Sequence, residues 1–368
     1  MIGPGARRLI LVLASLLVIT ACTPVVQTAG RPETGFSGPR LEPEAFVSSD
    51  GSRLHLTTYL PPAEPWAVIV GVHGMNSYAT AFRQAGPYWA SQGIAVFAYD
   101  QRGFGHSPNR GVWPGTALLT EDLRVITTLV RQRYPGAIIA VAGVSMGATV
   151  AIEAFASDRP PPADRLLLFA PGVWGWSQQA PTSAATIWMM SHLAPGMTVK
   201  PPRWVVRHYL SSDNEAEIER AANDPLIIWN MRPDSFYGFF GMMEDASQDV
   251  TRLRVPVTYF YGAKDRMMPP KVTLPVVRRL PAGARTAYYP LGWHLLLLDK
   301  QSPTVWADAV AFVRDPAAPW PSGVGAIPGA PPWPSQTRTS PRRRPCRNAS
   351  RRRRAAPVFS NAMTHGSV

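Results

Sequence analysis

The chain has 368 residues, of which 46% are hydrophobic and 17% charged, a composition that excludes a fibrous protein and leaves enough apolar surface for a sizeable core. At this length one catalytic domain with extensions is the leading expectation. The net charge is +13, but nine arginines after Asp315 supply most of it, so the body of the chain is only mildly basic and no nucleic-acid partner is expected.

The first residues predict an export signal. Two arginines precede an apolar run, Leu9–Ile19, which is shorter than the roughly 20 residues of a membrane-spanning helix. The tetrapeptide ITAC at 19–22 resembles the lipobox of bacterial lipoproteins. This resemblance implies removal of residues 1–21 and acylation of Cys22, which would anchor the protein to a bacterial cell membrane or outer membrane on the periplasmic side. The alternative is a plain cleaved signal with a chance cysteine.

The segment that follows is polar and rich in Gly and Pro, so residues 22–43 are predicted to be a tether. Two alternating runs, Glu44–Ser49 and Leu54–Leu60, flank the turn dipeptide Asp50-Gly51 and predict a β-hairpin. The folded domain is therefore expected to begin at residue 44.

Strand and helix patterns then alternate. Short apolar runs bounded by turn residues predict buried strands, and apolar residues at helical spacing predict helices. The strands are Trp66–Val72, Gly93–Tyr99, Ala137–Val144, Arg165–Phe169, Val255–Tyr261 and Thr286–Tyr289, and the helices are Ala79–Gln92, Leu119–Arg133, Ala148–Ala156 and Val305–Val313. This alternation predicts an α/β domain over residues 44–315, with a mostly parallel sheet of about eight strands flanked by helices.

Two further segments stand apart from this pattern. An insertion at about residues 172–250 is too long for an ordinary connection, and its many Trp, Met and Phe residues predict a helical cap that also lines a pocket for an acyl chain. Residues 316–368 are rich in Pro, Gly, Ser and Arg and are predicted to be a disordered tail. The two cysteines, Cys22 and Cys346, lie outside the predicted domain, so no disulfide framework is expected.

The stretch from Gly143 to Gly147 matches the G-x-S-x-G nucleophile elbow, with a predicted strand before it and a helix after it. Ser145 is therefore the candidate nucleophile, and it needs a base that an acid orients. Asp265 and His294 each follow a late strand, in the order serine, acid, histidine. A helix cap or salt bridge for Asp265 and a structural role for His294 are the alternatives. Asp299 is a reserve candidate for the acid, but it follows His294 in the chain and so does not fit the order serine, acid, histidine.

Acyl transfer also needs donors for the oxyanion that develops during attack. The backbone N–H of Met146 is one candidate, and that of Met75, in the loop after the third predicted strand, Trp66–Val72, is the other. His73 is predicted to brace this loop by hydrogen bonds. The charged residues of Asp100–Ser107 are likewise predicted to brace the sheet, and no metal or other cofactor is implied.

Five motifs in order resemble the monoacylglycerol lipase and lysophospholipase branch of the α/β hydrolases, of the serine aminopeptidase S33 (Hydrolase_4) type. They lie between about Glu44 and Arg314 and comprise His73-Gly74-Met75, Tyr99–Ser107, Gly143–Gly147, Tyr261–Asp265 and Trp293-His294. The resemblance implies an α/β-hydrolase fold that cleaves single-chain acyl esters through an acyl-enzyme. Ser145 would attack, His294 would transfer the proton, Asp265 would orient His294, and the amides of Met75 and Met146 would stabilise the oxyanion. One departure is Asn76, where the family's H-G-x-G motif has its second glycine.

Two other classes of function stay open. An acyltransferase, thioesterase or peptidase would use the same acyl-enzyme, which the sequence alone does not distinguish. A non-catalytic lipid-binding protein could also keep the fold, although such a protein has no need of a complete nucleophile, base, acid and elbow.

Overall fold

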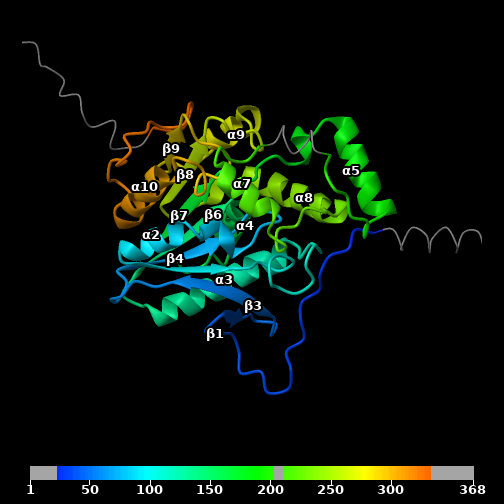
Figure 1. The fold of residues 1–368 in the computed structure, drawn as a ribbon, viewed down its shortest axis with the longest axis horizontal. Coiled ribbons are helices and arrows are strands. Elements are labelled where there is room, and N and C mark those ends of the chain that lie inside the picture. The colour runs from blue at the N-terminus through cyan, green and yellow to red at the C-terminus, as the bar shows by residue number, and fades with distance from the viewer. Residues whose placement is uncertain (1–22, 203–209, 333–368) are drawn as a thin grey trace, which may run out of the picture.

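The computed structural model of the protein describes residues 23–202 and 210–332. The predicted signal peptide, Cys22 and the arginine-rich part of the tail lie outside these residues. A nine-stranded sheet crosses the molecule, with helices on both faces (Figure 1). In chain order its strands are β1 (Arg40–Glu42), β2 (Ala45–Val47), β3 (Arg53–Tyr59), β4 (Ala67–Val72), β5 (Ile94–Tyr99), β6 (Ile138–Val144), β7 (Arg165–Phe169), β8 (Val257–Gly262) and β9 (Arg285–Tyr289).

The strands lie in the order β1-β2-β3-β5-β4-β6-β7-β8-β9. The six strands from β4 to β9 are parallel to one another. Strands β1, β2 and β3 continue the sheet through antiparallel pairs, the last of them between β3 and β5. The predicted fold class is confirmed, and the predicted hairpin is the pair β2 and β3, in which Phe46 faces Leu54. Every residue of β4 and β5 is buried, as their continuous apolar sequences require when helices cover both faces.

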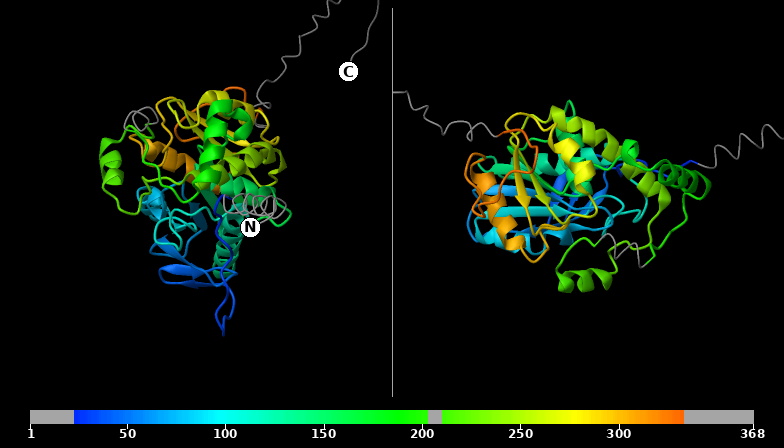
Figure 2. Two further views of the ribbon diagram at one scale, coloured as in Figure 1. Left: turned by 90° about the vertical axis from the view of Figure 1, so that its right-hand side faces the viewer. Right: turned by 90° about the horizontal axis from the view of Figure 1, so that it is seen from above.

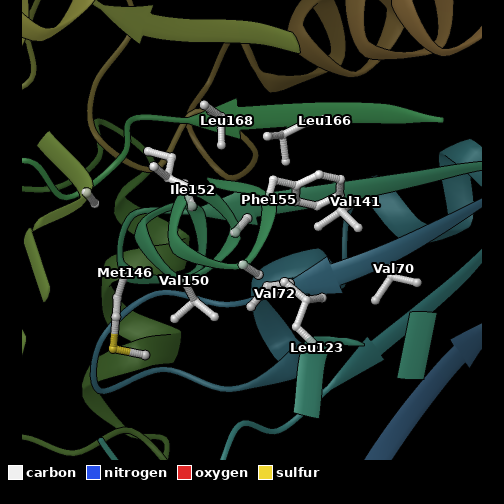
Figure 3. Packing of buried hydrophobic residues seen from close by; sticks show 14 of the residues in the cluster. Val70, Val72, Leu123, Val141, Met146, Val150, Ile152, Phe155, Leu166 and Leu168 are labelled. Carbon is white, nitrogen blue, oxygen red and sulfur yellow. The ribbon is translucent and has the colours of Figure 1, made fainter. Parts of the chain in front are cut away.

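The helices divide the core into two layers. Helices α3 (Thr116–Arg133), α4 (Met146–Ala156) and α9 (Pro270–Val277) cover one face, and α2 (Ala85–Ser91) and α10 (Ser302–Arg314) cover the other. Because successive side chains of a strand point to opposite faces, Val70 packs in the first layer and Ile69 in the second. Figure 3 shows the first layer, where side chains from β4, β6 and β7 meet those of α3 and α4.

Between β7 and β8 the chain forms the predicted helical cap. Its described elements are the 3-10 turns η2 (Trp176–Gln178) and η3 (Val250–Arg252) and the helices α5 (Pro181–Leu193), α7 (Glu215–Ala222) and α8 (Pro233–Asp249). Helix α8 packs against α4, and α5 packs against α8. Figures 1 and 2 show α5 at one end of the molecule, farther from the sheet than α8.

One predicted helix is interrupted. The segment predicted as a single helix from Ala79 to Gln92 forms a 3-10 turn, η1 (Ala79–Phe82), followed by α2. Pro87 lies in the first turn of α2, where its missing N–H costs no intrahelical hydrogen bond. The same residue inside one long helix would remove such a bond.

The two ends of the domain differ from the prediction. Strand β1 and a bridge between Val26 and Trp113 lie inside the predicted tether, so much of that segment pairs with the domain and supplies the ninth strand. The first part of the predicted tail, residues 316–332, also packs against the domain. Trp320 donates to the carbonyl of Thr286 at 3.2 Å, and Ile327 is 1% exposed. A few apolar residues therefore hold in place a segment that was predicted from its composition to be disordered.

No helix within the described residues is long and apolar enough to cross a membrane.

Candidate active site

Ser145 occupies a sharp turn between β6 and α4. Its φ of 52° and ψ of −117° are unfavourable for a residue with a side chain, and strained backbone of this kind is concentrated at functional sites. The strand ends at Val144 and the helix begins at Met146, so a single residue makes the change of direction. The turn holds the Ser145 side chain at the carboxyl end of the sheet, with 7% of the residue exposed.

The two glycines of the motif are required by close approach of the backbone. A Cβ atom on Gly147 would lie 2.1 Å from the carbonyl oxygen of Val72, at the end of β4. A Cβ atom on Gly143 would lie 2.5 Å from Cα of Ala148. Any side chain at either position would therefore push α4 away from the strands and displace Ser145.

Asp265 and His294 form a buried pair. The carboxylate Oδ2 of Asp265 lies 2.8 Å from Nδ1 of His294, and its Oδ1 accepts hydrogen bonds from the backbone N–H groups of Met267 and Met268, both at 2.8 Å. Asp265 is 3% exposed and His294 1%. With Asp265 ionised, Nδ1 of His294 is the natural donor, which leaves Nε2 as the nitrogen that can accept a proton.

The loops that carry this pair are packed backbone to backbone. A Cβ atom on Gly262, the last residue of β8, would lie 2.5 Å from the carbonyl carbon of Gly292. Lys264 N–H also donates to the carbonyl of Gly292 at 2.9 Å. This contact draws together the loops after β8 and β9 and brings Asp265 to His294.

The three predicted residues follow β6, β8 and β9, so all lie at the carboxyl edge of the parallel sheet. Nε2 of His294 is buried and has no hydrogen-bond partner among the described residues, and it is therefore not hydrogen-bonded to Ser145 in this structure. Hydrogen bonds between catalytic groups are often long without substrate and tighten when it binds. The free Nε2 is the atom that would have to contact the serine hydroxyl.

Asp299, the reserve acid, has a different environment. Its Oδ2 accepts a hydrogen bond from the backbone N–H of Trp293 at 3.1 Å, and within the described residues its side chain makes no hydrogen bond to the ring of His294, whose Nδ1 is paired with Asp265. Burial, with the nearby charge of Asp213, raises the pKa of Asp299 to about 7. A carboxyl that is partly protonated at neutral pH is a poor partner for an imidazolium, and Asp265 therefore fits the role of the acid better.

The loop after β4 lies directly against Ser145. A Cβ atom on Gly74 would be 3.2 Å from Cβ of Ser145, so only glycine allows this approach without a shift. The next amide, that of Met75, donates to no acceptor in the described part of the chain. The amide of Met146 is the first N–H of α4, which a helix leaves without an intrahelical acceptor. Both predicted oxyanion donors are thus available beside Ser145.

The unusual Asn76 has a structural reason. Its φ is 62°, in the left-handed region that glycine adopts freely and that asparagine tolerates better than most residues. Its carbonyl accepts a hydrogen bond from the N–H of Ile228 in the cap at 3.0 Å. Asn76 thus keeps the backbone conformation that a glycine would adopt, and its carbonyl links the loop to the cap.

His73 braces this loop from the sheet side. Its Nε2 accepts from the backbone N–H of Gln101 at 2.9 Å, and its Nδ1 lies 2.8 Å from the carbonyl of Gly74, so the ring is a neutral tautomer with hydrogen on Nδ1. Burial lowers the pKa of His73, which keeps the ring neutral. The bracing role predicted for His73 agrees with these contacts.

The loop from Asp100 to Ser107 is held by ion pairs. Arg102 is buried and bonds both Asp50 and Asp122, which ties this loop to the β-hairpin and to α3. The carboxylate of Asp100 accepts from the backbone of Ala79 and from His106. Ligand atoms of His55, Asp100 and His106 lie within 4.8 Å of one another, the one such group within the described residues. The Asp100 carboxylate already accepts three hydrogen bonds, which accounts for its position without a metal ion.

A cavity of about 500 Å³ lies between the cap segment of residues 222–232, Thr198 and the loop at Arg110 and Gly111. Its lining includes Ile228, whose N–H binds Asn76, together with Ile227, Trp229, Arg110 and Arg232. Ser145 is not part of the lining, so in this conformation the cavity and the serine are separate. The bond from Ile228 to Asn76 and the packing of Gly262 on Gly292 were not predicted, because both are contacts between segments that are distant in the sequence.

Comparison with known proteins agrees with the fold and identifies the family. The family model described as Serine aminopeptidase, S33 (Hydrolase_4) matches residues 63–301. A monoacylglycerol lipase of Mycolicibacterium smegmatis is 23% identical over 272 residues, which cover 73% of this chain and 95% of that protein. A monoacylglycerol lipase of Paleococcus ferrophilus superposes with a TM-score of 0.58 at 19% identity, over 71% of this chain and 98% of that one. For a carboxyl esterase of Bacillus coagulans crystallised with glycerol the TM-score is 0.59 at 19% identity, over 73% and 96% of the two chains.

Proposed function

The chain belongs to the Hydrolase_4 family of α/β hydrolases, and from that premise we propose that it is a serine hydrolase that cleaves carboxylic esters of single-chain lipids, of the monoacylglycerol or lysophospholipid type. The observation that carries the proposal is the buried pair of His294 and Asp265 at the same sheet edge as the strained Ser145. The names of the similar lipases and esterase support an ester as substrate.

In the proposed reaction Ser145 Oγ attacks the acyl carbon of the ester while Nε2 of His294 takes the hydroxyl proton. Asp265 holds Nδ1–H of the ring and stabilises the imidazolium that forms. The amides of Met75 and Met146 donate to the oxyanion of the tetrahedral intermediate. His294 then protonates the leaving alcohol, and water activated by the same ring releases the fatty acid from the acyl-enzyme.

A lipid-like acyl group is favoured by the composition of the cap. Helix α8 brings Phe239, Met242 and Met243 into the buried core beside α4, and Trp174 and Phe240 pack against the same core. Flexible methionine and rigid aromatic side chains form an adaptable apolar wall. Such a wall suits an acyl chain better than a small polar ester.

We further propose that the protein is exported and anchored through an acylated Cys22. The lipobox-like tetrapeptide at 19–22 supports this, and Val25, three residues after Cys22, is the first of the described residues that hydrogen-bonds to the domain. Intact-mass measurement of the purified protein tests the proposal: removal of residues 1–21 and the added mass of acyl chains are expected. A chain that keeps residues 1–21, or an unmodified Cys22, would refute it.

The catalytic proposal is tested by labelling with a fluorophosphonate and by turnover of p-nitrophenyl esters. Wild-type protein should be labelled and active, and Ser145→Ala should lose both properties while its circular dichroism stays unchanged. Ser157→Ala, a hydroxyl at the other end of α4, is the matched control and should behave as wild type. Unchanged turnover in Ser145→Ala would overturn the proposal, and an unlabelled wild type would favour a lipid-binding protein.

The substrate class is tested with a panel of monoacylglycerols, lysophospholipids, acyl thioesters and aminoacyl amides. Preference for the lipid esters is expected. Preference for thioesters or amides would leave the triad in place but change the reaction to that of a thioesterase or peptidase, and transfer to an added alcohol would indicate an acyltransferase.

A further inference from the structure

The outer part of the cap is apolar and uncharged. Between Arg165 and Lys200 the sequence contains no Asp, Glu, Lys or Arg, and α5 lies in the middle of this stretch. Three large apolar residues of α5 are exposed to solvent: Trp188 by 54%, Met189 by 48% and Leu193 by 67%. An exposed cluster of large apolar side chains with no charged residue among them is unusual on the surface of a soluble protein and marks an interaction site.

The start of the described chain is fixed to the same side of the domain. The N–H of Val25 donates to Asp234, at the beginning of α8, at 3.3 Å, and Gln27 N–H donates to the carbonyl of Trp113 at 2.8 Å. Asp234 is buried and is also bonded to Arg232, so its position is determined by the domain. All the views in Figures 1 and 2 show the described chain starting beside α5.

This attachment limits how far an anchor at Cys22 can lie from Val25, and so from the side of the domain to which Val25 is bonded. Cys22 precedes Val25 by three residues, and an extended chain spans at most about 3.6 Å per residue, so the reach is about 11 Å. A free tether over residues 22–43 would instead allow several times that distance. Val25 and Val26, near the start of the described chain, are themselves exposed by 43% and 49% and add apolar surface next to the predicted anchor.

We propose that Trp188, Met189 and Leu193 of α5, together with Val25 and Val26, form a docking face that lies on the lipid surface to which the protein is anchored. The inference rests on the proposed acylation of Cys22. Tryptophan and aliphatic side chains partition into the interface of a bilayer, and the absence of acidic residues avoids repulsion by anionic lipids. The short connection keeps this face against the bilayer and so holds the cap, under which an acyl substrate must enter, toward the membrane.

A second copy of the chain is the competing occupant. It is disfavoured because the acyl chains of Cys22, within about 11 Å of Val25, would already hold this side of the protein at the bilayer. A dimer through α5 would turn the same side away from the lipid.

The test uses the full acylated protein in vesicles of phosphatidylethanolamine and phosphatidylglycerol with brominated acyl chains, which quench nearby tryptophans. Trp188→Phe should reduce the quenching of total fluorescence by about half, because interfacial tryptophans lie near the acyl chains. Trp66→Phe, at the start of β4, is the matched control and should leave the quenching unchanged. Equal quenching in wild type and Trp188→Phe would overturn the docking face.

A second measurement follows hydrolysis of monoolein in the same vesicles. The variant with Trp188, Met189 and Leu193 changed to Ser should lose about tenfold in rate on vesicles, while turnover of soluble p-nitrophenyl butyrate is kept, because only access to the bilayer changes. Leu60→Ser, equally exposed at the end of β3, should have no effect. Unchanged vesicle hydrolysis in the triple variant would count against docking. A dimer in detergent that the triple variant dissociates would assign the face to protein contact and also overturn it.

Failure of the proposed function gives a different pattern. If the wild type hydrolyses no ester, neither in vesicles nor in solution, the catalytic proposal fails, and the quenching contrast between Trp188→Phe and Trp66→Phe alone decides whether the face contacts lipid.

Discussion

Glu153 is a half-buried carboxyl between helix α4, which follows Ser145, and the cap. It lies on α4, opposite α8, and its Oε1 has no hydrogen-bond partner among the described residues. Burial, then the nearby charges of Asp249 and Asp245, raise its pKa from the ordinary value of 4.5 to about 8, against the opposing effect of Arg252. The ionised form is therefore unfavourable in the folded protein.

The sign and size of the effect follow from this difference in pKa. A carboxyl whose pKa is raised by folding contributes stability that is fully present below about pH 4.5 and is lost as the pH rises through about 8. At 1.36 kcal/mol per pH unit the upper limit is about 5 kcal/mol. Solvent reaches part of the side chain and screens the interaction, so we expect a loss of about 2 kcal/mol.

Glu153→Gln removes the charge and keeps the shape, so its effect should depend on pH. At pH 8.5 we expect the free energy of unfolding of the variant, measured in urea, to be about 2 kcal/mol higher than that of the wild type. Near pH 4.5 the two free energies of unfolding should be equal. Glu219→Gln, on the exposed face of α7, should change stability by less than about 0.5 kcal/mol at either pH. A difference between Glu153→Gln and wild type that is the same at both pH values would refute the reasoning.

Three further predictions concern the site. Asp265→Asn should lower kcat on p-nitrophenyl esters by about 10⁴-fold because the His294 ring loses its orientation, whereas Asp299→Asn should stay within about threefold of wild type; equal losses would contradict the choice of acid. Gly147→Ala puts a Cβ atom 2.1 Å from a carbonyl oxygen, so it should lower the Tm by at least about 4 °C and prevent fluorophosphonate labelling, and a wild-type melting curve would be inconsistent with the packing. Asn76→Gly should leave the unfolding free energy near wild type, while Asn76→Val should cost about 1–2 kcal/mol in urea unfolding; similar stabilities would show that the left-handed backbone at this position is not needed.

The central fold was predictable because its signals are long and local. Continuous apolar strands such as β4 and β5 and the helical spacing of α3 specify a parallel sheet with covered faces. The segments at the edges were not predictable, since their order depends on single long-range contacts. Trp320 and Ile327 hold residues 316–332 against β9, and nothing in the surrounding Pro and Gly residues indicates that contact.

The site shows the same division. The elbow motif located Ser145, and the order of strands led to Asp265 and His294. The order of the motifs did not explain why Asp265, and not Asp299, contacts the ring of His294. The reason is that the backbone of Gly262 lies directly on that of Gly292. This packing is visible only in the folded structure, where the two loops meet. The sequence marked Asn76 as a departure, and its positive φ shows why this residue can replace glycine.

The oxyanion loop is held from two sides, and this connects the site to the cap. On the sheet side, neutral His73 joins Gln101 to the carbonyl of Gly74; on the cap side, Ile228 N–H binds the carbonyl of Asn76. Met75, the proposed oxyanion donor, lies between these two attachments. Movement of the cap at Ile228 away from the sheet must break the second attachment while the first persists. The orientation of the Met75 amide is thus coupled to the position of the same cap that we place against the membrane, so substrate entry and completion of the oxyanion site involve one structural element.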